Sequence, residues 1–205
     1  MSDRTLAVVS AGLSVPSSTR LLADRLADAA SAALGRRDLT TDVTVIELRE
    51  YARDLADNLV TGFANRHLSD VIDAVVRADG LIAVTPIFAA SYSGLFKTFF
   101  DVLDRDTITG KPVLMGATAG TARHSLALEH AMRPLFAYLR ALPVPTGVIA
   151  ASDDWAGGDG VNPALSDRID RAAGELADLV AARPAAPPTD PFANPTPFES
   201  LLGGG

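Results

Sequence analysis

Residues 6–30 have the sequence LAVVSAGLSVPSSTRLLADRLADAA, in which a short apolar run is followed by a turn and then by an amphipathic pattern. The run Leu6–Ser10 is almost continuously apolar, as strands are when helices cover both faces of a parallel sheet. After the turn, Leu22, Leu26 and Ala29 recur at the spacing of one helix face. The segment therefore predicts a strand, a turn and a helix in succession.

The same alternation continues along the chain. Further strands are predicted at Val43–Glu47, Leu81–Thr85, Val113–Thr118 and Gly147–Ala151. Further helices are predicted over residues 68–76, from near Ser93, over Ser125–Leu142 and over Pro163–Ala182. Five strands alternating with five helices imply right-handed crossovers and helices on both faces of the sheet. We therefore predict an α/β fold with a doubly wound, five-stranded parallel sheet in the flavodoxin-like order 2-1-3-4-5.

The 205 residues suit one domain, which we predict over residues 1–183. Residues 184–205 contain six of the 13 prolines and end in three glycines, so we predict a C-terminal tail without a core of its own. Phe192, Phe198 and Leu201 are costly to leave in water. They favour docking of the tail on a neighbouring subunit or a partner.

Composition excludes several classes of protein. The chain has no cysteine, which rules out disulfide scaffolds, Fe–S clusters and thiol catalysis. A net charge of −7 disfavours nucleic acid as a partner. No apolar run reaches the about 18 residues of a membrane span, and the N-terminus has no signal-peptide pattern. We expect a cytoplasmic protein that binds neither nucleic acid nor membrane.

Ligands of open α/β sheets bind beyond the carboxyl ends of the strands, where the strand order reverses. The loop after the first predicted strand contains Ser10, Ser17, Ser18 and Thr19 and runs into a helix N-terminus. Free N–H groups and the helix dipole there attract phosphate, and hydroxyl groups add hydrogen bonds. Helix capping by Ser17 or Ser18 is the alternative explanation for one of these residues. The pattern favours a phosphate site.

Two more loops reach the same edge of the predicted sheet. Residues 85–94, TPIFAASYSG, are apolar, and their backbone could line a flat heteroaromatic ring between Ile87 and Phe88. A buried connection is the alternative. Residues 118–124, TAGTARH, are small enough to let a ligand approach the backbone closely. The three loops together favour a nucleotide-like ligand more than any one of them.

Three segments resemble NAD(P)H-dependent FMN reductases, above all those that serve two-component alkanesulfonate, methanesulfonate and luciferase-like monooxygenases. They are VSAGLSVPSSTRLLADRLA (residues 9–27), TPIFAASYSGLFKTFFDVLD (85–104) and GATAGTARHSLALEHAMRPLFAYLRALPVPTGVIAASDDW (116–155). The resemblance covers residues 5–180. It implies a flavodoxin-like fold, FMN and NAD(P)H as cofactors, and hydride transfer without a side-chain acid or base. It also implies a homodimer or homotetramer that supplies reduced FMN to a partner monooxygenase.

The resemblance also assigns site residues. The FMN phosphate would be held by Ser10, Ser17, Ser18 and Thr19, and the ring lined by Pro86, Ile87, Phe88, Thr118, Ala119 and Gly120. Phe88 stands where many relatives have Tyr, so a hydroxyl contact is lost while stacking remains. Ala89 stands where relatives often have Lys, which puts electrostatic help from that position in doubt.

The predicted helix over Ser125–Leu142 contains Pro134, which has no N–H to donate to the carbonyl of His130. This favours a kink or a π-bulge around His130. An exposed histidine beside an ordinary proline kink is the alternative. In the reductases that the chain resembles, a residue at this place is associated with a π-helix at a subunit interface and with flavin that exchanges as a substrate.

Two other functions remain open at this point. The first is an NAD(P)H quinone or azo reductase that retains FMN, and the second a non-enzymatic flavodoxin-like electron carrier, which a single aromatic wall, Phe88, disfavours. We expect no metal site, because His124 and His130 are six residues apart on different helix faces. Trp155 either packs on the rim of the active site or caps the sheet, and we favour the cap. Arg123 is a candidate for binding the NADPH phosphate or an incoming flavin, and a surface ion pair is the alternative.

Overall fold

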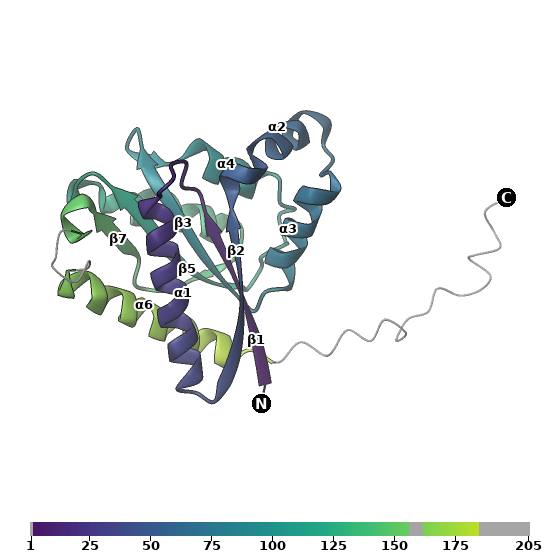
Figure 1. Cartoon of the computed structure of the whole chain (residues 1–205). Coiled ribbons are helices and arrows are strands. Elements are labelled where there is room, and N and C mark those ends of the chain that lie inside the picture. Colours follow the sequence, from purple (N-terminus) through teal and green to yellow (C-terminus); the bar gives the residue numbers. More distant parts are fainter. Residues whose placement is uncertain (1, 156–161, 185–205) are drawn as a thin grey trace, which may run out of the picture.

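The computed structural model describes residues 2–155 and 162–184, in which a sheet is covered by helices on both faces (Figure 1). The strands are β1 (Ser2–Ser10), β2 (Leu39–Glu47), β3 (Gly80–Phe88), β4 (Ser91–Tyr92), β5 (Pro112–Ala119), β6 (Leu142–Pro143) and β7 (Val148–Ala151). The α-helices are α1 (Ser18–Gly35), α2 (Ala52–Thr61), α3 (Arg66–Arg77), α4 (Gly94–Asp101), α5 (Arg133–Tyr138) and α6 (Pro163–Ala182). Single 3₁₀ turns lie at Leu48–Tyr51, Ala122–His124 and Ser152–Trp155.

The sheet has seven strands in the described residues, so the predicted five-stranded sheet is wrong in its strand count. The main path runs β2-β1-β3-β5-β6, with parallel neighbours throughout. The edge strand expected at Gly147–Ala151 is preceded by β6, and both β6 and β7 pair with β5. Pro145 lies between them and has no N–H for the ladder, which accounts for the break. The short β4 pairs antiparallel with the end of β3.

Both faces of the sheet are buried, as the continuous apolar runs predict. Helices α1 and α6 cover one face, and α3, α4 and α5 cover the other (Figure 1). Along β1, Leu6 and Val8 pack with α1 and α6, whereas Ala7 and Val9 pack with the opposite layer. Because successive side chains of a strand point to opposite faces, each face needs its own apolar set.

Helix α2 was not among the predicted helices. Leu55 is its one buried residue, while Leu59 and Val60 are exposed. The signal was nevertheless available, because the apolar residues of this segment recur at the spacing of one helix face: Ala52, Leu55, Ala56, Leu59 and Val60.

The helix predicted over Ser125–Leu142 is shorter than expected and is distorted. Residues Leu128–Met132 form a π-helix that continues into α5, and Leu142 already belongs to β6. Pro134 is the second residue of α5, so the missing N–H coincides with the wide turn around His130. The predicted π-bulge is confirmed.

No helix among residues 2–155 and 162–184 is long and apolar enough to cross a membrane. The predicted tail, with Phe192, Phe198 and Leu201, lies outside the described residues apart from its first residue.

Candidate functional site

The loop between β1 and α1 is fixed at both ends. At its start, the N–H of Ala11 donates to the carbonyl of Val84 in β3, 2.9 Å away. At its end, Ser17 is the N-cap of α1, and its Oγ accepts from the N–H of Arg20 at 3.2 Å. The capping function of Ser17 is therefore present, and the loop is anchored independently of any ligand.

Two features of this loop fit a bound phosphate. The Oγ of Ser10 is buried and has no hydrogen-bond partner among the described residues. A buried hydroxyl without a partner costs about 1–3 kcal/mol, which a ligand atom would offset. At Gly12, a Cβ would overlap the Oγ of Ser17 and lie 3.1 Å from the Cβ of Thr19, so the loop closes tightly around a residue without a side chain.

Thr19 occupies a different position from the other predicted phosphate residues. Its buried hydroxyl lies 2.8 Å from that of Thr118, at the end of β5. This bond joins the start of α1 to the far side of the site. Thr19 therefore holds two of the predicted loops together.

A cavity of about 210 Å³ lies where the three predicted loops meet. Seven of the ten predicted site residues line it: Ser18, Pro86, Ile87, Phe88, Thr118, Ala119 and Gly120. Ser10, Ser17 and Thr19 are not in its lining. We call this space the ring cavity. Its position beyond the carboxyl ends of β3 and β5 is the one that the sequence predicts.

The ring cavity has a fourth wall that the sequence analysis missed. Ala150, Ser152 and Trp155, at and after the end of β7, complete the lining. Trp155 therefore lies at the rim of this space, the alternative to the favoured cap, and it also packs against the core on the α1 and α6 side. The signal was available, since a fifth parallel strand must end at the same edge as the other four.

The turn after β3 is strained. Ala89 and Ala90 both have positive φ, 48° and 70°, which alanine rarely adopts. The turn joins β3 to β4, and Thr85 Oγ1 accepts from the N–H of Ser93 at 3.0 Å. These contacts hold Phe88 at the mouth of the ring cavity, where it is 49% exposed.

Charged residues brace the β1–α1 loop from the side of β2. The carboxylate of Glu47 accepts from Arg20 at 2.8 Å and from Arg49 at 3.0 Å. Arg49 in turn donates to the carbonyl of Ser14 at 3.3 Å. A hydrogen bond to Asp24 raises the pKa of Arg20, against the opposing effect of burial. The two arginines therefore support the loop while they are themselves paired.

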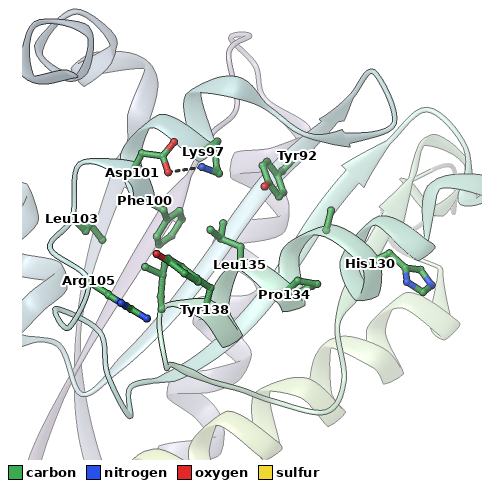
Figure 2. A pocket seen from close by; sticks show the side chains of 12 residues that line it. Tyr92, Lys97, Phe100, Asp101, Leu103, Arg105, His130, Pro134, Leu135 and Tyr138 are labelled. Carbon is green, nitrogen blue, oxygen red and sulfur yellow. Dashed lines mark hydrogen bonds and ion pairs between the residues drawn. The ribbon is translucent and has the colours of Figure 1, made fainter. Parts of the chain in front are cut away.

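A larger groove of about 660 Å³ lies away from this site, between α4 and α5 (Figure 2). None of the ten predicted site residues lines it. Lys97 and Asp101 form an ion pair on one wall, and Arg105 lies 5.2 Å from the ring centre of Tyr138 on the other. His130 and Pro134 bring the π-helix to its rim (Figure 2). We call this space the helix groove. Its larger volume does not make it the candidate site, because the predicted site residues line the ring cavity instead.

The wound sheet, the hydroxyl-rich loop and the ring cavity define a flavodoxin-like α/β protein with a cavity at the carboxyl edge of its strands. The chain matches the family model for NADPH-dependent FMN reductases over residues 4–156. It belongs to that family.

Individual relatives agree with this assignment. The chain is 38% identical to an FMN reductase (NADPH) of Pseudomonas aeruginosa, over 85% of this chain and 91% of that protein. It is 35% identical to the NADH-dependent FMN reductase SfnF of Pseudomonas putida, over 80% and 86%. The crystal structure of an oxidoreductase from Corynebacterium diphtheriae has a TM-score of 0.85 and 49% identity, with 90% and 100% covered. A flavodoxin-type WrbA-like protein from Agrobacterium tumefaciens, at 16% identity and a TM-score of 0.59, shows the fold alone and covers 88% and 98%.

Proposed function

We propose that this protein is an NAD(P)H-dependent FMN reductase. The observation that carries the proposal is the convergence of all six predicted ring residues and of Ser18 on one cavity, beside a buried serine hydroxyl that lacks a partner in the described residues. The family and the named relatives support the same activity. FMN supplies the ring that accepts hydride from the nicotinamide.

The residues of this chain bind and orient the two reactants. The first N–H groups of α1, with Ser10 and Ser18, would hold the FMN phosphate, and Ser17 fixes the helix end that presents them. The backbone of residues 86–88 and 118–120 would line the ring, while Phe88 and Trp155 exclude water from its sides. No side-chain acid or base is required.

The direct test is anaerobic oxidation of NADH and NADPH with free FMN, FAD and a quinone compared side by side. We expect rapid oxidation with FMN. No oxidation of either nucleotide with FMN would overturn the proposal.

The second candidate function is a non-enzymatic, flavodoxin-like electron carrier. Trp155 supports this function, because Trp155 and Phe88 give the cavity two aromatic walls. Tightly bound FMN without nucleotide oxidation would favour that function instead.

Ser10→Ala is expected to weaken FMN binding about tenfold without reducing the stability of the ligand-free protein. The hydroxyl has no partner among the described residues, so the free protein loses nothing when it is removed. A lost hydrogen bond to a charged phosphate is worth about 1.5 kcal/mol or more, which corresponds to tenfold. Titration calorimetry with FMN and urea unfolding measure the two quantities. Equal FMN affinity in both proteins would remove Ser10 from the phosphate site.

We further propose that reduced FMN leaves to serve a flavin-dependent, luciferase-like monooxygenase in the cytoplasm. The half-exposed Phe88 at the mouth of the ring cavity supports an exchangeable flavin. A relative named an NADH-dependent FMN reductase, at 35% identity, supports it as well. Desalting of protein saturated with FMN tests the point. Release of most of the FMN is expected, and retention of one FMN per chain would favour the quinone or azo reductase.

The helix groove supports a homo-oligomer. Its rim carries the π-helix, and Tyr138 on the same face is 63% exposed. We propose that a second copy of the chain covers this face, in a homodimer or homotetramer. Tyr138→Glu is expected to dissociate the assembly in sedimentation velocity because it replaces an exposed aromatic ring with a carboxylate that must lose its water in the contact. Leu59→Glu, at an exposed position of α2, is the control. A monomeric parent protein, or a variant that keeps the parent's mass, would exclude this interface.

A further inference from the structure

A second cavity adjoins the ring cavity along the edge strand β7. It has a volume of about 400 Å³ and is lined by residues of the π-helix, of β7, of α6 and of the two loops that also bound the ring cavity. Ala122 follows Gly120 of the ring cavity by two residues, and Asp154 directly precedes Trp155. Two short segments, residues 118–125 and 149–155, thus contribute to the linings of both cavities.

Arg168 is the positively charged residue in the lining of this second cavity. It projects from α6, and its Nη2 donates to the carbonyl of Ile149 at 3.3 Å and lies 3.8 Å from Asp154 Oδ1. Its Nε is buried and has no hydrogen-bond partner among the described residues. The edge of the guanidinium that carries Nε thus has an unmet donor. A guanidinium presents paired donors that match a phosphate group.

The acidic residues of the cavity are already engaged. Glu129 receives two hydrogen bonds from Arg133, at 2.5 and 2.9 Å. Asp154 Oδ2 accepts from the N–H of Ala151 at 2.8 Å, which fixes the turn after β7. Asp154 Oδ1 also forms the 3.8 Å ion pair with Arg168 Nη2, so both carboxylates have donors, and the Nε of Arg168 is the donor without a partner among the described residues. Ser125, in the same lining, adds a hydroxyl.

We propose that this cavity receives a phosphate group of the pyridine nucleotide whose nicotinamide enters the ring cavity, and that Arg168 recognises it. The inference rests on the proposed function, because that function makes a dinucleotide the reductant. Arg123, the earlier candidate, directly follows Ala122 of the cavity wall and is exposed, but it is not among the lining residues.

Two different parts of the nucleotide carry a phosphate group that Arg168 would bind in the same way. The diphosphate occurs in both NADH and NADPH, whereas the 2′-phosphate occurs in NADPH only. Binding of 2′,5′-ADP, ADP and adenosine, each measured by calorimetry, distinguishes them. If the cavity holds the 2′-phosphate, 2′,5′-ADP binds at least tenfold more tightly than ADP. If it holds the diphosphate, ADP binds as well as 2′,5′-ADP, and adenosine binds at least tenfold more weakly than either.

Arg168→Gln is the test variant, and Arg171→Gln, at an exposed position of the same helix, is its matched control. We expect Arg168→Gln to raise the KM for the nucleotide at least tenfold and to weaken binding of the tighter ADP probe equally. The KM for FMN and the kcat are expected to stay within twofold of the parent. Arg168→Lys keeps the positive charge but loses the paired N–H donors of the guanidinium, so we expect a KM for the nucleotide between those of the parent and Arg168→Gln.

Unchanged nucleotide KM and probe binding in both Gln variants would overturn the inference while FMN reduction continues. If the parent protein reduces no FMN, the proposed function fails, and probe binding still reports on the cavity by itself. If Arg168→Gln does not fold, as judged by circular dichroism, Arg168→Lys decides by the same two measurements.

Discussion

Gly12→Ala is expected to lower the affinity for FMN about 100-fold, or about 2.8 kcal/mol, while the sheet stays folded. The new methyl group would overlap the Oγ of Ser17, which caps α1 by accepting from the N–H of Arg20. Ser17 must then rotate, and loss of the cap costs about 1 kcal/mol. The helix N–H groups that would hold the phosphate also shift, and each charged hydrogen bond is worth about 1.5–3 kcal/mol.

Gly35→Ala, at the end of the same helix, is the matched control, because nothing lies within 4 Å of a Cβ there. Calorimetry with FMN gives the affinity, and urea unfolding gives the free energy of unfolding. Gly35→Ala should bind FMN like the parent. If Gly12→Ala also binds like the parent, the β1–α1 loop does not hold the phosphate.

Lys111→Met is expected to remove a strong alkaline dependence of stability. Burial, helped by nearby Arg183 and opposed by Asp79, lowers the pKa of Lys111 from 10.5 to about 8. Between pH 8 and pH 10.5 the unfolded chain keeps this proton while the folded protein releases it, so stability rises with pH. At about 1.4 kcal/mol per pH unit, the parent gains roughly 3 kcal/mol over this range relative to Lys111→Met.

Urea unfolding at pH 7.5, 8.5, 9.5 and 10.5 measures this difference. Lys97→Met is the control, because Lys97 is the chain's other lysine and is partly exposed beside Asp101. Its curve should run parallel to that of the parent. A Lys111→Met curve that also runs parallel would show that Lys111 stays charged in the fold, held by the carbonyls of Val76 and Ala78 to which it donates.

Much of the fold follows from the local pattern, and the exceptions have physical causes. The apolar runs at β1, β3 and β5 predict strands because both of their faces are buried. β6 is only two residues long, too short to show a period. Helix α2 carries apolar residues at helical spacing, so the sequence contains a signal for it that the prediction did not use. The π-helix was predictable because it depends on one local cause, the missing N–H of Pro134.

The sequence predicts the parts of the site that are formed by the ends of strands. It does not predict the parts that depend on contacts between side chains distant in the chain. Residues 86–88 and 118–120 line the ring cavity because their strands end at one sheet edge, which topology alone requires. The bond between Thr19 and Thr118 joins residues 99 apart in the chain, and nothing in the local sequence signals it. The cap was favoured for Trp155 because only the loops after the first, third and fourth predicted strands were assigned to the site.

The break between β6 and β7 has a consequence for the behaviour of the protein in concentrated solution. An unbroken outer strand would offer a row of free N–H and C=O groups to which another polypeptide can add. Here the row is interrupted at Pro145, and the guanidinium of Arg133 donates to the carbonyls of Val144 and Pro145 at 3.1 and 2.9 Å. That border is thereby protected against fibril-like extension.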